Sequence, residues 1–145
     1  RSSIWFNSIV RADVDTINIG EGCNIQDGSI LHVSSGYPLV LENMVSVGHG
    51  SILHGCYVEK GALIGIGSII LDGARIGRET VVGAGSLVLE NTVLPERSLV
   101  IGRPARVIRE LSAEEVQKFG RTASRYLEYA QTYLNTGWSK GSGTV

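Results

Sequence analysis

An aliphatic residue returns at every sixth position over the middle of this 145-residue chain. Seven consecutive members stay in register, namely Val58, Ile64, Ile70, Ile76, Val82, Val88 and Leu94. A small residue follows four positions after most of them, as at Ala62, Ser68 and Ala74. A period of six fits neither the α-helix, with about 3.6 residues per turn, nor the coiled coil, with about 3.5. The pattern therefore predicts a β-solenoid in which each hexapeptide supplies a short strand and a corner.

The hexapeptide pattern also covers the N-terminal third of the chain, where two segments carry extra residues. The aliphatic series there is Ile19, Ile25, Leu31, Leu41, Val47 and Leu53. We expect loops before Ile19 and between Leu31 and Leu41, where the spacing exceeds six. Glycine, present 19 times, permits the backbone angles of the corners. The pattern resembles that of known hexapeptide-repeat proteins, and this resemblance implies three hexapeptides per triangular coil and a left-handed winding.

The pattern changes to that of a helix after residue 110. Ser112 and Glu115 form the sequence of a capping box, which is typical of a helix start. Apolar residues then recur at three- and four-residue spacing, at Val116, Phe119, Ala123, Tyr126, Leu127, Ala130, Tyr133 and Leu134. We therefore expect a left-handed parallel β-helix over residues 1–110, a C-terminal α-helix packed along the prism over 111–136, and a loose tail over 137–145.

Composition excludes several classes of function. The net charge of −1 and a pI near 6.3 give no basic surface for nucleic acid or an anionic membrane. No apolar run approaches the 18 or so residues that a membrane span needs. The two cysteines, Cys23 and Cys56, make no disulfide framework, and we expect both to be packing residues. A reducing, cytoplasmic location is the expectation.

All three histidines fall within 23 residues, at His32, His49 and His54. With three hexapeptides per coil, Leu53 stacks on Leu31, so His32 and His54 share a column about 4.8 Å apart. Two imidazoles at that spacing can both reach one zinc ion at roughly 2.0–2.1 Å. His49 follows its inward aliphatic by two positions and therefore lies across a corner, where a neighbouring chain could bring it to the same metal. Surface or packing roles remain the alternative for each ring taken alone.

The same count gathers further polar residues around the histidines. Arg11 falls in the column of His32, and Asp27 falls directly beneath His49 with Gln26 beside it. When two such faces meet between subunits, Arg11 of one chain would face Asp27 of another in a charge-assisted pair. Tyr126 is the only tyrosine of the helix that we consider as a site residue.

Six segments occur along the chain in the order VRADV, NIQDGSILHV, VGHGSILHGC, GIGSIILDGARI, VGAGSLV and IGRPARVIREL. Together they resemble the gamma-class carbonic anhydrases and their bacterial homologues. The likeness runs from about Ile4 to Leu134, and the histidine set is its most specific part. It implies a left-handed β-helix homotrimer with three interface metals, each held by His32 and His54 of one subunit and His49 of the next.

The resemblance also implies a reaction, the reversible hydration of CO2 to bicarbonate. Zinc is the expected metal, with Fe2+ or Co2+ as alternatives, and its bound water loses a proton near neutral pH. Gln26 would hold the resulting hydroxide, and Arg11 with Asp27 would fix the interface. Asp13 and Asn24 match further polar surroundings of the metal in that family.

One segment departs from the family. Its founding members carry an acidic loop whose glutamates shuttle protons, whereas the corresponding HVSSGYPLV has no carboxylate. Hydration should therefore be slow and limited by proton export. Two other functions stay open. One is an acyltransferase with one histidine as general base, and the other is a non-catalytic metal-binding scaffold. Assays for bound metal and for acyl-CoA binding separate the first of these from the anhydrase.

Overall fold

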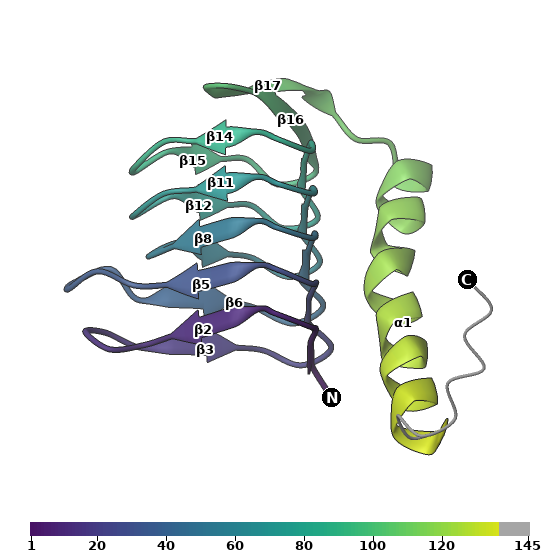
Figure 1. Ribbon diagram of the computed structural model, residues 1–145. Helices are drawn as coiled ribbons and strands as arrows, with labels where there is room; N and C mark the ends of the chain where they lie inside the picture. Colours follow the sequence, from purple (N-terminus) through teal and green to yellow (C-terminus); the bar gives the residue numbers. More distant parts are fainter. Residues whose placement is uncertain (137–145) are drawn as a thin grey trace.

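The chain winds in short strands around a triangular prism, as the hexapeptide pattern predicts (Figure 1). The computed structural model describes residues 1–136. Residues 137–145, expected as a loose tail, lie outside the described residues. Within residues 1–136, no helix is both long and apolar enough to span a membrane.

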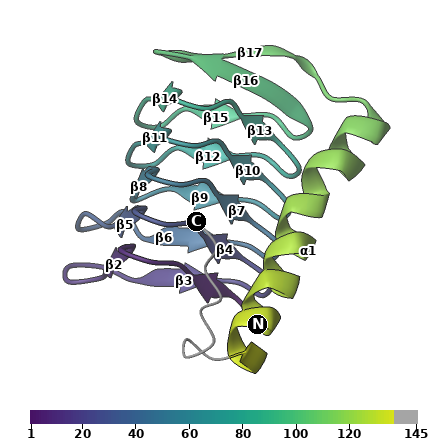
Figure 2. The same cartoon turned by 45° about the vertical axis from the view of Figure 1, so that its right-hand side comes forward.

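Three sheets form the sides of the prism, and successive strands fall on successive sheets (Figure 2). Sheet A contains β1 (Ser3–Ile4), β4 (Asn24–Ile25), β7 (Ser46–Val47), β10 (Leu63–Ile64), β13 (Val81–Val82), β16 (Ser98–Gly102) and β17 (Ala105–Glu110). Sheet B contains β2 (Ile9–Arg11), β5 (Ile30–His32), β8 (Ile52–His54), β11 (Ile69–Ile70) and β14 (Leu87–Val88). Sheet C contains β3 (Ile17–Ile19), β6 (Leu39–Leu41), β9 (Tyr57–Val58), β12 (Arg75–Ile76) and β15 (Val93–Leu94). Sheets B and C each have five strands, so the solenoid makes about five coils.

The inward aliphatic residues form the core. Ile64 pairs in parallel register with Val47 on the coil before it and with Val82 on the coil after it. All three side chains are fully buried, and so are the small residues Ala62 and Ser68. The interior of the prism is thus filled by one large and one small residue from each hexapeptide, which confirms the predicted pattern. Burial of the aliphatic series is the main source of stability in this architecture.

Glycine is required where adjacent corners touch. At Gly48 an added Cβ would lie 2.7 Å from the backbone nitrogen of Ile66 and 2.8 Å from the carbonyl oxygen of Ile64. The amide of Gly48 instead donates a 2.8 Å hydrogen bond to that Ile64 oxygen. A side chain at Gly48 would therefore separate two coils next to His49.

The upper end of the prism carries an antiparallel hairpin that the hexapeptide pattern did not predict. Strand β17 turns back on β16 through Gly102, which has φ +115°. The helix α1 (Ala113–Thr136) follows it. Its start is the predicted capping box, because the Ser112 amide donates to Glu115 Oε2 at 3.0 Å and the Glu115 amide donates to Ser112 Oγ at 3.2 Å.

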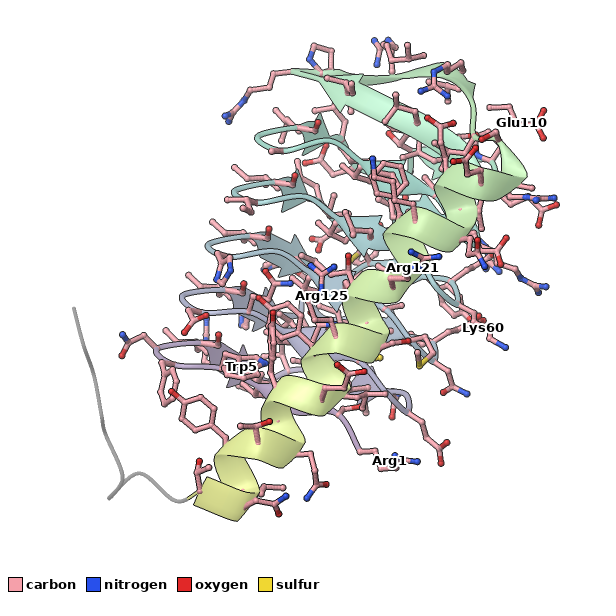
Figure 3. All side chains as sticks on the ribbon, turned by 90° about the vertical axis from the view of Figure 1, so that its right-hand side faces the viewer. Arg1, Trp5, Lys60, Glu110, Arg121 and Arg125 are labelled. Carbon is pink, nitrogen blue, oxygen red and sulfur yellow. The ribbon has the colours of Figure 1, made fainter. Side chains whose placement is uncertain are left out.

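Helix α1 runs back along sheet A toward the first coil and contacts β1 and β4 (Figures 1 and 3). Ala123 is buried against the prism, which confirms that the apolar stripe packs there. Leu134 is 80% exposed, contrary to a stripe that is buried throughout. The reason is geometric, since the helix continues past the first coil and its last turn has no sheet beneath it.

The two cysteines are packing residues, as expected. Cys23 and Cys56 are free and about 1% exposed. Burial raises the pKa of the Cys56 thiol to about 12, with the negative charge of Asp72 adding to the effect. Neither thiol is available as a thiolate ligand or nucleophile near neutral pH.

Candidate metal centre

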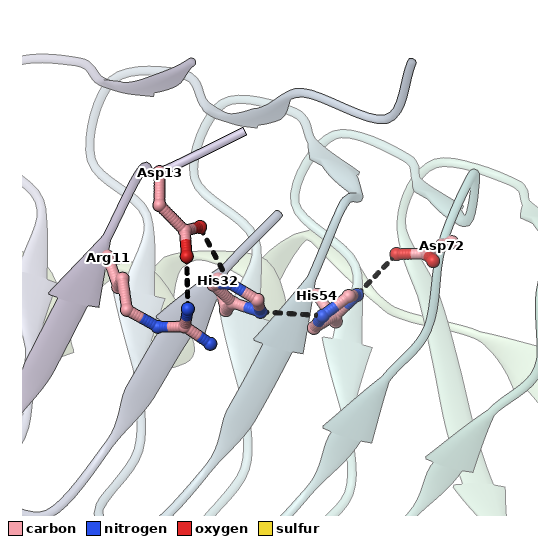
Figure 4. Close-up of polar contacts among 5 residues, drawn as sticks. All are labelled: Arg11, Asp13, His32, His54 and Asp72. Atoms are coloured by element: carbon pink, nitrogen blue, oxygen red, sulfur yellow. Dashed lines mark hydrogen bonds and ion pairs between the residues drawn. The ribbon is translucent and has the colours of Figure 1, made fainter. Parts of the chain in front are cut away.

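A row of polar side chains crosses successive coils at the carboxyl ends of the strands of sheet B (Figure 4). His32 ends β5 and His54 ends β8, and the two residues pair in register. Nδ1 of His32 lies 2.8 Å from Nε2 of His54. Arg11 ends β2 and pairs in register with His32 on the next coil. The predicted column of Arg11, His32 and His54 is confirmed.

A carboxylate holds the outer nitrogen of each of these two rings. Asp13 Oδ1 lies 3.0 Å from Nε2 of His32, and Asp72 Oδ1 lies 2.5 Å from Nδ1 of His54. Asp13 also forms an ion pair with Arg11. The hydrogen bond with His32 is the main reason why the pKa of Asp13 is lowered. The row therefore reads Arg11, Asp13, His32, His54, Asp72.

Three contacts join Asp13, His32, His54 and Asp72, but two neutral imidazoles carry only two N–H groups. Ionised carboxylates can only accept, so with neutral rings each outer contact uses one N–H and the two inner nitrogens face each other with lone pairs. A cation between the rings satisfies both lone pairs. That cation can be a proton shared by the two rings or a divalent metal.

His49 lies on a different corner, as predicted. It follows β7 of sheet A, and its Nδ1 is 3.0 Å from Asp27 Oδ2 on the coil beneath. Its Nε2 is 3.3 Å from the hydroxyl of Tyr126, which reaches it from α1. Burial raises the pKa of Tyr126, and the charge of Asp27 adds to that rise. When the Nδ1–H of a neutral His49 donates to the carboxylate of Asp27, the hydroxyl of Tyr126 donates to the Nε2 lone pair.

Asn24 and Gln26 lie on and just after β4, and both are buried. Nε2 of Gln26 donates to Oδ1 of Asn24 at 3.0 Å, and Nδ2 of Asn24 donates to Oγ of Ser46 at 2.8 Å. The side-chain amide of Gln26 is thereby fixed against Asn24. Within the single chain Asp27 contacts His49 and Arg11 contacts Asp13, so the expected pairing of Arg11 with Asp27 between subunits stays a prediction.

The three histidines of one chain do not form a complete site. Among residues 1–136, no group of three or more His, Cys, Asp or Glu side chains could hold a metal ion. Each ring nevertheless has a carboxylate on one nitrogen, which is the usual support of a metal-binding histidine. The inner nitrogens of His32 and His54 need to separate by about half an ångström to match two ligands of a tetrahedral zinc. The donor set therefore fits a zinc-like metal, divided between two faces.

Asp72 is the site residue that the sequence analysis missed. The predicted polar column ended at His54, although Leu53 pairs with Ile70 one coil later. Continuing the same count places Leu71 over His54 and Asp72 over Gly55. The signal was present in the sequence, but it stood inside the apolar run SIILDGA.

Comparison with known proteins places the chain in a family. Residues 55–90 match the bacterial transferase hexapeptide family of six repeats. The chain is 51% identical to a "Probable carbonic anhydrase" of Methanocaldococcus jannaschii, over 90% of this chain and 82% of that protein. It is 50% identical to a "Carbonic anhydrase" of Geobacillus kaustophilus, over 91% of this chain and 72% of that protein. An acetyltransferase candidate of Bacillus cereus is 52% identical with a TM-score of 0.90, over 94% of this chain and 79% of that chain. On these identities and this coverage, the chain belongs to the gamma carbonic anhydrase family of hexapeptide-repeat proteins.

Proposed function

We propose that this protein catalyses the reversible hydration of CO2 to bicarbonate at metal sites shared between the subunits of a homotrimer. His32 and His54 of one subunit and His49 of the next would hold the metal, with Zn2+ expected and Fe2+ or Co2+ as alternatives. The observation that carries this proposal is the stacking of His32 on His54, whose facing ring nitrogens lie 2.8 Å apart. The names of the two relatives that are about 50% identical point to the same reaction.

A trimer follows from the division of the site over two faces. Each subunit carries one half of a site on one face and the other half on another face. Closed three-fold symmetry brings these halves together at three interfaces and so forms three complete sites. Arg11 of one subunit would then face Asp27 of its neighbour, close to both halves of the site. A hydrogen-bonded pair of guanidinium and carboxylate is directional as well as charged, so it would fix how the two subunits align.

The bound metal would supply a nucleophile derived from water at neutral pH. The side chains around the metal would have the other roles in the reaction. Gln26, fixed by Asn24, would orient the nucleophile through its amide. The hydrogen bond between the Tyr126 hydroxyl and Nε2 of His49 would break when that ring turns to the metal, which would free the Nε2 lone pair. Asp13 lies at the exposed end of the row, but its lowered pKa makes it a weak proton acceptor near neutrality. Export of the proton should therefore depend on buffer.

Metal analysis and stopped-flow CO2 hydration test the proposal directly. Purified protein should contain about one metal per chain, and His32→Ala, His49→Ala and His54→Ala should each lose most of it, because two protein nitrogens are too few. Glu59→Gln is the matched control, since it removes a carboxylate that follows β9 and pairs with Arg75 rather than with a member of the row. Bound acetyl-CoA with no metal and no hydration would favour the acyltransferase instead.

Subunit mixing tests whether the site is shared. His49→Ala subunits keep His32 and His54, whereas His54→Ala subunits keep His49. Co-expression of the two should restore one intact interface in each mixed trimer, so that a purified mixed trimer holds about one third of the metal and activity of the wild-type trimer. If each site were built within one chain, mixing the two variants would restore neither metal nor activity. That result would refute the shared site.

A further inference from the structure

Asp72 makes the shortest contact to any of the three histidines. Its Oδ1 lies 2.5 Å from Nδ1 of His54, and the two side chains are 25% and 28% exposed. An ionised carboxylate has no proton to donate, so the hydrogen of this contact belongs to His54. A charge-assisted bond of this kind is stronger than a neutral one. Asp72 therefore favours one of the two tautomers of His54, the one protonated at Nδ1.

The backbone around Asp72 is arranged so that this contact can form. Asp72 stands one coil above Gly55, where an added Cβ would lie 2.4 Å from Oδ1 of Asp72. The absence of a side chain at Gly55 leaves the carboxylate free to reach down to His54. The coil above holds Asp72 in turn, because its carbonyl oxygen accepts a 2.9 Å hydrogen bond from the amide of Asn91. The amide of Gly73 bonds the carbonyl of Gly55 at 2.8 Å.

We propose that Asp72 is a positioning residue that holds His54 in the Nδ1–H tautomer and so directs the lone pair of Nε2 toward His32. The proton on one ring nitrogen of a histidine is set by the partner of the other nitrogen. Without Asp72, a hydrogen on Nε2 can bond Nδ1 of His32 and occupy the space between the rings. The consequence for metal binding rests on the proposed function, whereas the tautomer of His54 can be observed without a metal.

The first test is the tautomer itself in the metal-free full chain. Nitrogen-15 NMR of the side chains resolves the two ring nitrogens, and the chain has only three histidines to assign. At about pH 8, where free imidazole is neutral, wild-type His54 should carry its proton on Nδ1. Asp72→Ala should move that proton to Nε2 in most molecules. A wild-type His54 protonated on Nε2, or a population unchanged in the variant, would overturn the proposal.

The second test measures affinity for Zn2+ by competition with a chelator. Loss of a supporting carboxylate typically weakens metal binding by about 10- to 100-fold, and Asp72→Ala should fall in that range. Asp72→Asn keeps the size of the side chain and serves if the alanine variant does not fold. Asp72→Asn should also shift the tautomer of His54 and weaken the binding of Zn2+, because a neutral amide is a poorer hydrogen-bond acceptor than a carboxylate. Glu59→Gln, which removes the partner of Arg75 on sheet C, should leave both readouts unchanged.

The two tests separate failure of this inference from failure of the proposed function. If wild-type protein binds no Zn2+ but His54 shows the Nδ1–H tautomer only when Asp72 is present, the metal proposal falls and the role of Asp72 stands. If zinc binds tightly and equally to wild type, Asp72→Ala and Asp72→Asn, the metal proposal stands and the positioning role of Asp72 is refuted.

Discussion

Replacement of Gly48 by alanine should destabilise the protein through the contact between two corners. The new Cβ would lie 2.7 and 2.8 Å from backbone atoms of the next coil, where ordinary contact begins near 3.4 Å. The coils must therefore separate by 0.6–0.7 Å, which lengthens the 2.8 Å bond from Gly48 to Ile64 to about 3.4–3.5 Å, past the usual 2.7–3.2 Å range of N–H···O bonds. Loss of the bond costs about 0.5–1.5 kcal/mol, and the buried carbonyl left without a partner costs about 1–3 kcal/mol more. The expected total is about 1.5–4.5 kcal/mol.

Gly50→Ala provides the matched control in the same corner. Gly50 has φ +65° and no atom within 4 Å of an added Cβ, so alanine there pays only for its backbone conformation, about 1–2 kcal/mol. Thermal unfolding at one protein concentration should lower Tm by roughly 5–15 °C for Gly48→Ala and by less for Gly50→Ala. If Gly48→Ala is as stable as Gly50→Ala, the tight approach of the two corners does not explain the glycine.

Four further outcomes can be measured. Tyr126→Phe should tighten zinc binding about twofold in a chelator competition, because the hydroxyl caps Nε2 of His49 through a bond worth about 0.5 kcal/mol that the metal must break; weaker binding would contradict this order of events. Arg109 holds the pKa of Glu115 at about 2, below its ordinary value of 4.5. The ion pair therefore contributes its full stabilisation above pH 4.5, and this stabilisation is lost as the pH falls toward 2. The difference in urea midpoint between wild type and Glu115→Gln should shrink over that window, and a constant difference would argue against the ion pair. Cys56, with a pKa of about 12, should resist alkylation by iodoacetamide at neutral pH until the protein is denatured, and labelling of the native protein would contradict its burial. Added imidazole buffer should raise the turnover number at fixed pH and ionic strength, and a fast enzyme insensitive to buffer would reveal a proton path through residues not named above.

The period of six made the fold and the histidine column predictable. A strict repeat fixes the register between coils, so the stacking of His54 on His32 follows from counting alone. The same count placed Asp27 beneath His49. These predictions concern Cα positions, and a solenoid repeats its Cα positions from coil to coil.

Side-chain partners were less predictable, because they depend on rotamers and on local space. Asp27 was expected to face Arg11 of another subunit, yet within the chain its carboxylate bonds His49. Asp72 reaches His54 only because Gly55 leaves room, and neither residue stands out in the repeat. Sequence periodicity also carries no information on where the prism ends, so the exposure of Leu134 was not foreseen.

The length of helix α1 is tied to the number of coils in the solenoid. From Ala113 to Tyr126 the helix extends by roughly 20 Å along its own axis. It crosses the coils obliquely (Figure 2), and Tyr126 reaches His49, which follows β7. Insertion of one more coil above the site would lift the start of the helix by about 4.8 Å. Three or four added helical residues would restore the height, and four would turn Tyr126 by only about 40°. The number of coils and the length of the helix can thus change only together if the tyrosine is to keep its place.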